Sequence, residues 1–194
     1  MDFTEVLAKR RMVRNYTDEA VLPDALERIV DAGRRAPSAG FSQGQTFILI
    51  TDPEIRSGVA HLAGEDEYAA SGFDRWISLA PAHIVICVSE EAYHERYRES
   101  DKTDEEGAEI EWPVPFWWVD AGASMMAILL ATVNEGLAAG FLGVHSIEGL
   151  KDLLGVPAEV SPIGIVTVGH AAPDRRSRSL TRGWKPDAVH RDRW

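Results

Sequence analysis

Four cationic side chains fall within six residues near the N-terminus, in the run Lys9-Arg10-Arg11-Met12-Val13-Arg14. No acid interrupts this run, although the whole chain carries a formal net charge of −11. Arginine suits phosphate because its planar guanidinium group can hold two oxygens at once. Each charge-assisted hydrogen bond of this kind contributes roughly 1.5–3 kcal/mol. The run is therefore a candidate anion site.

A second group of cations lies near the C-terminus and comprises Arg175, Arg176, Arg178, Arg182 and Lys185. An acidic chain that gathers cations at both ends favours one anion site built from two distant pieces. The alternative is two solvated surface patches without a ligand, because charge runs are usually exposed. The charges alone leave both hypotheses open.

A loop of small and polar residues, 37–44, lies between a predicted helix and a predicted strand. Its backbone could approach a flat ring closely, and Gln43 offers both a donor and an acceptor, although an ordinary turn is the alternative. Residues 40–44 also match the G-x-S-x-G motif of hydrolases. That motif needs a strand before the serine and a helix after it, and the order here is the reverse. We therefore reject a serine hydrolase.

Other catalytic and metal motifs do not occur in the sequence. It contains no Walker A motif and no G-x-G-x-x-G, which argues against a P-loop or a Rossmann site. His94 and Glu95 lack the second histidine of a zinc helix, because Arg98 stands at that position. Acids 104–106 lack the spacing of a calcium loop. We predict no metal site and name no acid–base catalytic residue.

Strands alternate with helices, which predicts one mixed α and β domain over residues 1–194, built around one sheet. The helix expected at 119–137 is apolar on nearly every face, so it must be buried centrally or against a second subunit. Apolar runs and helical spacing place strands at 45–51, 82–89, 140–144 and 163–169, and helices at 4–9, 22–36, 52–62, 68–77, 119–137 and 148–154.

Two segments differ from this pattern. Residues 90–111 hold ten acids and little periodicity, which predicts an exposed excursion or lid that reaches to about residue 118. The aromatic residues of 112–118 close it, and they could line a pocket, cover an interface or pack in the core. The tail 170–194 is rich in arginine and is expected to be an arm.

Composition limits the partners and the location. The acidic balance argues against binding to nucleic acid or to a membrane surface. The most apolar stretch, 121–133, is too short to span a bilayer. The single Cys87 lies in an apolar run and is expected in the core, and the N-terminus has no secretory signal pattern. We therefore expect a reducing cytoplasm.

Four motifs, in order along the chain, resemble the nitroreductase-like FMN-binding family. The opening Arg10-Arg11-Met12-Val13-Arg14 resembles its first signature, and Ala36-Pro37-Ser38-Ala39-Gly40 with Gln43 resembles its second. Residues 140–149 resemble the segment after the family's central helix. Val166-Thr167-Val168-Gly169-His170, followed by the arginine-rich tail that ends at Arg193-Trp194, resembles its C-terminus.

The resemblance implies an α+β fold with a central, mostly antiparallel sheet flanked by helices. It implies a homodimer with two FMN sites at the subunit interface, the long helix in the dimer core and the arm around the partner. The N-terminal motif of such proteins holds the FMN phosphate and ribityl chain. Arg10 and Arg11 would hold the phosphate with the backbone of Met12, which stands where the family often has a serine. Arg14 would reach the pyrimidine edge, where a cation favours the reduced, anionic flavin.

The same resemblance assigns the remaining site residues. Pro37, Ser38, Ala39 and Gly40 would line the ring, with Gln43 as a polar contact. Ile147, Glu148 and Gly149 would offer backbone N–H groups to the reactive edge, and Arg182 and Lys185 would return to the phosphate. Trp184 stands where a second basic residue is common. Asp74 and Arg75 give no counterpart to the polar flavin contacts of many relatives.

The expected activity follows from this resemblance. It is FMN-dependent transfer of hydride from NADH or NADPH to nitroaromatic, quinone or related small acceptors, in ping-pong order. The alternatives are a non-catalytic flavin-binding or flavin-storage protein and a plain phosphate- or nucleotide-binding module.

Overall fold

One antiparallel sheet organises the chain in the computed structural model, which describes residues 1–144, 147–174 and 181–194. Its strands follow the order β1-β2-β4-β3, so β3 is an edge strand. Strand β2 is the most deeply buried, because its run of apolar residues faces helices on both sides. The strands are β1 Gln45–Ile50, β2 Ala82–Ser89, β3 Ala138–Gly143 and β4 Val160–Gly169.

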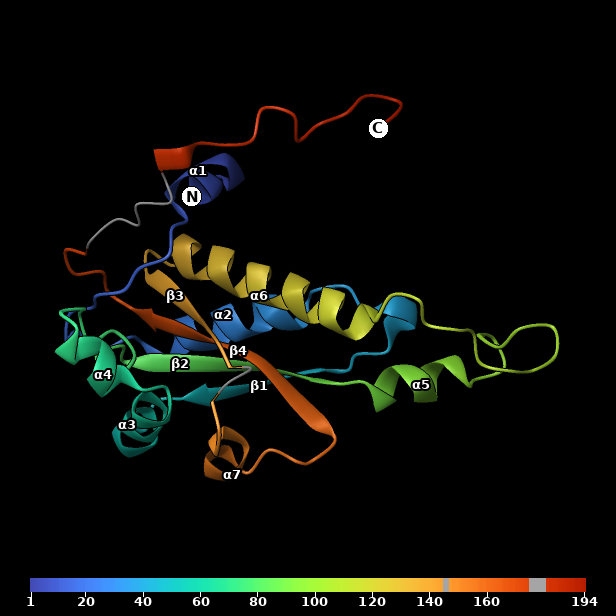
Figure 1. Cartoon of the computed structure of the whole chain (residues 1–194), viewed down its shortest axis with the longest axis horizontal. Coiled ribbons are helices and arrows are strands. Elements are labelled where there is room, and N and C mark those ends of the chain that lie inside the picture. Colours follow the sequence, from blue (N-terminus) through green and yellow to red (C-terminus); the bar gives the residue numbers. More distant parts are fainter. Residues whose placement is uncertain (145–146, 175–180) are drawn as a thin grey trace.

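Helices cover both faces of this sheet (Figure 1). Helices α2 (Pro23–Arg34) and α6 (Phe116–Asn134) pack on one face in the larger core cluster. Helices α3 (Pro53–Leu62) and α7 (Leu150–Leu154) pack on the other. The predicted α+β fold is confirmed. The remaining helical segments are α1 Phe3–Lys9, the 3-10 turn η1 Ala39–Phe41, α4 Glu65–Ala70 and α5 Glu91–Tyr97.

Cys87 lies in the core, as predicted. Its side chain is fully buried in β2. Burial raises the pKa of its thiol to about 11, so the thiol stays protonated at neutral pH. We infer a packing role for this residue.

The helix predicted at 68–77 is wrong in its bounds. Helix α4 begins at Glu65 and ends at Ala70, and Gly72 then takes a φ of 84°. The carboxylate of Glu65 accepts hydrogen bonds from the backbone N–H groups of Ile77 and Ser78. These bonds hold 77–78 outside a helix, and local spacing does not reveal them.

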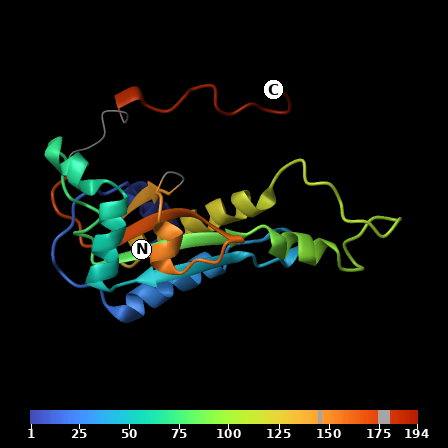
Figure 2. The same ribbon diagram turned by 60° about the horizontal axis from the view of Figure 1, so that its bottom comes forward.

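The exposed excursion is shorter than the sequence predicts. Helix α5 occupies its first part, and Tyr93 in this helix is fully buried. Residues 98–115, which we call the excursion, extend beyond the end of the sheet in both views (Figure 1, Figure 2).

The aromatic residues that begin α6 after the excursion differ in their burial. Trp117 is buried in the core, whereas Trp118 is 44% exposed at the start of α6.

Glu109 in the excursion contacts α5 through His94, at 2.5 Å from its Nδ1. This hydrogen bond raises the pKa of His94 above its ordinary value of 6.5, and a second contact with Glu90 acts in the same direction. A raised folded-state pKa means that the charged His94 ring stabilises the packing of the excursion on α5. This stabilisation is fully present below pH 6.5 and is lost as the pH rises through the raised pKa.

We therefore expect hydrogen-exchange protection factors in residues 98–111 to fall as the pH rises above neutral. The variant His94→Phe keeps an aromatic ring and removes the titration, so its protection should not change over the same range. An equal fall in both proteins would contradict this prediction.

Helix α6 is 19 residues long, longer than the apolar stretch 121–133. By length and composition alone it is apolar enough to cross a membrane, a test that the core helix of a folded protein also passes. Here its buried side packs against α2 and the sheet. Its other side keeps Trp118, Val119 and Met126 between 43% and 52% exposed. One apolar side of α6 is therefore left exposed by the part of a single chain that the structure describes.

Candidate functional site

The basic segment, residues 9–14, docks on the edge strand β3. The N–H of Val13 donates to the carbonyl of Ala139 at 2.9 Å, and Met12 forms a parallel bridge with the same residue. A Cβ atom at Gly140 would lie 2.5 Å from the carbonyl oxygen of Val13, closer than real contacts allow. Gly140 therefore permits this close approach, and the free backbone groups of an edge strand explain why the segment binds there.

The three arginines of this segment differ in their surroundings. Arg11 forms an ion pair with Asp174 at 2.6 Å, and Asp174 also accepts the backbone N–H of Arg14. The Arg14 guanidinium lies over the ring of Trp76, 5.6 Å from its centre. Among the described residues, the guanidinium groups of Arg10 and Arg14 have no acceptor, so they are free to bind an anion.

The 37–44 loop is held by residues far away in the sequence. The buried carboxylate of Asp120 in α6 accepts the N–H of Ala39 at 2.8 Å and the hydroxyl of Tyr93 at 2.9 Å, both on Oδ2. Burial and this bond to Asp120 raise the pKa of Tyr93, so its hydroxyl remains a donor. Arg96 also donates to the carbonyl of Gly40 at 2.9 Å.

The backbone of this loop is strained. Gly40, Phe41 and Gln43 have φ values of 60°, 60° and 52°. A left-handed conformation is uncommon for a bulky side chain, and Phe41 is also 74% exposed, so its ring gives little to the core. Strain of about 1–3 kcal/mol per residue occurs chiefly at ligand-binding positions. Of the other predicted ring contacts, Pro37 is exposed and Ser38 accepts the N–H of Gln43 at 3.0 Å.

The third predicted piece, residues 147–149, lies beside a cavity. Ile147 is half-buried, and its N–H donates to the carbonyl of Val144 at 3.1 Å, so that donor is already used. Glu148 is exposed, and Gly149 takes a φ of 77° before α7. The cavity measures about 480 Å³. Its walls come from α6, β4, α7 and the segment that follows β3, and include Trp118, Val144, Leu150, Lys151 and Ile163.

The C-terminal cations are not brought to the basic segment. Arg182 and Lys185 are exposed on the arm, residues 181–194, which runs outside the body of the chain in both views (Figure 1, Figure 2). Trp184 and Trp194 on the same arm are 96% and 102% exposed. Arg175, Arg176 and Arg178 lie outside the described residues.

A single chain also separates the basic segment from the 37–44 loop. The loop is bonded to Asp120 near the start of α6, and the basic segment docks on Ala139, just beyond the end of α6 at Asn134 (Figure 1). Asp120 and Asn134 are fourteen residues apart. A helix rises about 1.5 Å per residue, so these positions are about 21 Å apart.

Sequence reasoning missed three residues that organise the site: Asp120, Asp174 and Trp76. Asp120 is a lone acid at the start of an apolar helix, a signal that points to a specific buried partner. Asp174 is an acid next to an arginine-rich tail, and its pairing with Arg11 spans 163 positions of sequence. Trp76 lies in the segment that resembles the family least, and no pattern marks it.

Comparison with known proteins shows which family shares this architecture. The model of the nitroreductase family matches residues 7–170. A relative from Archaeoglobus fulgidus, named for NADH dehydrogenase or NAD(P)H nitroreductase activity, is 26% identical over 98% of this chain and 97% of its own. The FMN reductase [NAD(P)H] of Bacillus subtilis is 29% identical over 89% of this chain and 66% of its own.

A solved structure has the same fold. The FMN-dependent nitroreductase of Clostridium difficile R20291 superposes with a TM-score of 0.73, at 20% identity over 99% of this chain and 100% of its own. With the family match over most of its length, the chain belongs to the nitroreductase family.

Proposed function

We propose that this protein is an FMN-dependent oxidoreductase that takes hydride from NADH or NADPH and reduces small acceptors such as nitroaromatics and quinones. The observation that carries the proposal is the pair of guanidinium groups, Arg10 and Arg14, which have no hydrogen-bond acceptor among the described residues and are held on an edge strand in a nitroreductase-family chain. Relatives named as NADPH nitroreductase and NADPH-flavin oxidoreductase support the reaction class.

The residues present fit FMN in their chemistry. Arg10 and Arg14 match a phosphate and an electron-rich ring edge, which both attract cations. Arg11 suits the phosphate less well, because Asp174 already pairs with its charge. The 37–44 loop supplies small side chains and a strained backbone that suit a flat ring. Met12, Ile147, Glu148 and Gly149 complete the contacts that we propose from the body of the chain, although the N–H of Ile147 is already bonded to Val144. Arg182 and Lys185 lie on the exposed arm, so we propose that they reach the phosphate from the arm of a second copy.

The chain's own residues bind and orient rather than exchange protons. When bound, FMN supplies the hydride chemistry between donor and acceptor. Arg10 would bind the negative charge of the phosphate at one end of the site, and Arg14 would stabilise negative charge on the ring edge at the other. Asp120 fixes the wall that the 37–44 loop provides. Because one ring face would serve both substrates, the donor leaves before the acceptor binds, which is ping-pong order.

We further propose that two copies of the chain build each site. The separation of about 21 Å along α6 supports this arrangement, because an antiparallel partner helix would bring its own 37–44 loop to the basic segment. The uncovered apolar side of α6 offers the surface for such a partner. A closed two-fold pair would contain two equivalent sites.

Mixing two inactive variants tests the shared site. One variant is Arg10→Gln with Arg14→Gln, and the other is Gly40→Val, whose Cβ would lie 2.7 Å from the Tyr97 ring. Refolded mixtures should regain activity, because a mixed pair contains one unaltered site and one doubly altered site. Mixtures that remain as inactive as either parent would overturn the shared site. Two Arg10→Gln/Arg14→Gln proteins mixed with each other serve as the control.

Steady-state kinetics test the reaction. We expect parallel lines in double-reciprocal plots of NADH or NADPH oxidation at several concentrations of a quinone or a nitroaromatic. Bound FMN with no turnover would instead support the storage alternative.

A further inference from the structure

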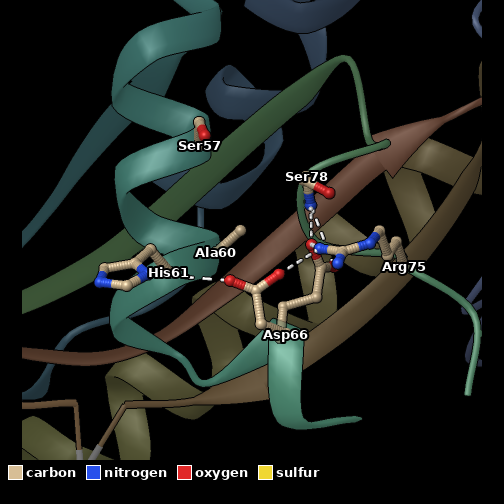
Figure 3. Close-up of a pocket in the computed structure, with 7 residues that line it drawn as sticks. Ser57, Ala60, His61, Asp66, Arg75 and Ser78 are labelled. Atoms are coloured by element: carbon tan, nitrogen blue, oxygen red, sulfur yellow. Dashed lines mark hydrogen bonds and ion pairs between the residues drawn. The ribbon is translucent and has the colours of Figure 1, made fainter. Parts of the chain in front are cut away.

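Residues 71–81, which we call the connector, join α4 to β2 and are fixed by buried side chains. Glu65 is 2% exposed, and its Oε1 accepts the N–H groups of Ile77 at 2.6 Å and Ser78 at 3.1 Å. The cluster around this contact is drawn in Figure 3, where Arg75 also pairs with Asp66 at 2.6 Å. A carboxylate that accepts two backbone donors in the interior holds the connector in one conformation.

Two more side chains bind the connector's carbonyl groups. Arg56 Nη1 donates to the carbonyls of Ser78 at 3.1 Å and Ala80 at 2.6 Å. The Nε2 of His83 lies 2.7 Å from the carbonyl oxygen of Ile77. Burial lowers the pKa of His83 to about 4, so its ring is neutral, and Nε2 carries the proton because a carbonyl only accepts. The backbone that follows Trp76 is therefore held from both its donor and its acceptor sides.

This fixed connector places the ring of Trp76 beside the contact between the basic segment and β3. The Arg14 guanidinium lies 5.6 Å from the ring centre. The same ring approaches Gly140, where an added Cβ would lie 2.8 Å from Trp76 Cζ3. Trp76 also packs against the cluster of Val13, Tyr16, Ala80 and Ala138. The Trp76 ring therefore packs against the same residues that hold the basic segment on β3.

We infer that Trp76 is a positioning residue that holds the Arg14 guanidinium in place for the electron-rich edge of the flavin. Arg14 has no other side-chain partner among the described residues, so without the ring its long side chain would sample many rotamers. A cation over an aromatic face is held by the ring quadrupole without losing its charge, whereas an acidic partner would neutralise it. This inference rests on the proposed function, because it names the ligand edge as that of FMN.

The test is a double-mutant cycle with Trp76→Ala, Trp76→Phe and Arg14→Gln. Two quantities are measured for each protein: the dissociation constant of FMN for the apoprotein, from quenching of flavin fluorescence, and the reduction midpoint potential of the bound FMN. We expect Trp76→Ala to weaken FMN binding about 2- to 5-fold in the Arg14 background, the size of an exposed cation–π contact. It should also lower the midpoint potential, because a displaced cation stabilises reduced, anionic flavin less.

The control arms separate positioning from packing. In the Arg14→Gln background, Trp76→Ala should change neither quantity beyond the measurement error. Trp76→Phe keeps a ring beneath the cation and should stay close to wild type. Phe73→Ala removes another aromatic ring from the connector, one whose ring contact is with Tyr68, and should leave the potential unchanged.

Each outcome decides the inference. Equal effects of Trp76→Ala with and without Arg14 would mean that the ring only packs, and would overturn the positioning role. If Trp76→Ala fails to fold, Trp76→Phe and Trp76→Leu are compared instead, and an equal potential in these two would overturn it. A wild-type apoprotein that takes up no FMN would overturn the proposed function and this inference together. Normal uptake without coupling would overturn the inference alone.

Discussion

Replacing Gly140 by alanine is expected to abolish the uptake of FMN and to destabilise the fold by about 1–3 kcal/mol, the usual cost of overpacking. The added Cβ would lie 2.5 Å from the Val13 carbonyl oxygen and 2.8 Å from both Thr167 Oγ1 and Trp76 Cζ3. The first of these atoms belongs to the backbone, so a rotamer change cannot relieve the contact. The basic segment must therefore move off β3, and Arg10 and Arg14 move with it.

Urea unfolding and FMN titration measure the two effects. Gly136→Ala is the matched control, because that glycine has a φ of 78° and no atom within 4 Å of the added Cβ. It should lose stability from backbone strain, about 1 kcal/mol or more, and still bind FMN. Wild-type FMN affinity in Gly140→Ala would contradict the docking of the basic segment as the basis of the site.

The second large effect is expected at Asp120. Asp120→Ala removes the acceptor for the Ala39 N–H and the Tyr93 hydroxyl, and leaves both donors without a partner. A buried donor without a partner costs about 1–3 kcal/mol, so we expect a loss of stability of that order or larger. The 37–44 loop then loses its anchor, and turnover with NADPH should fall by about tenfold or more, because misplacement of a ring wall affects the reacting geometry.

Asp120→Asn separates the anchor from the charge. Both hydrogen bonds reach the same oxygen, Oδ2, so an amide oxygen at this position can accept both. Thermal melting and kcat should therefore stay near wild type in Asp120→Asn and fall in Asp120→Ala. Equal losses in the two variants would show that the negative charge of Asp120 matters rather than the anchor.

Local sequence patterns predicted the elements whose ends are set by residues next to them in the sequence. Strand β2 has the predicted bounds, because its apolar run begins just after Pro81 and meets polar residues at Ser89 and Glu90. Helix α2 begins at Pro23 and ends before Pro37, where proline chemistry places both ends. The candidate anion segment was also visible, because four cations in six residues stand out in an acidic chain.

Long-range contacts decided what the sequence did not reveal. The connector is not helical because Glu65, Arg56 and His83 bind its backbone from separate elements. The charge of Arg11 is shared with Asp174, an acid at the far end of the chain. The separation of the 37–44 loop from the basic segment depends on the length of α6 between them. The order of the motifs along the sequence does not reveal this distance in space.

The central claim is that this chain binds FMN and passes hydride through it. The most direct measurement is the visible spectrum of the purified protein under anaerobic conditions, before and after addition of NADH or NADPH, with identification of the released chromophore. We expect the bands of oxidised flavin, FMN released at about one per chain, and bleaching of the bands by the nicotinamide donor. A colourless protein that also refuses added FMN would contradict the account, and the two basic groups would then be an unidentified anion site or solvated surface.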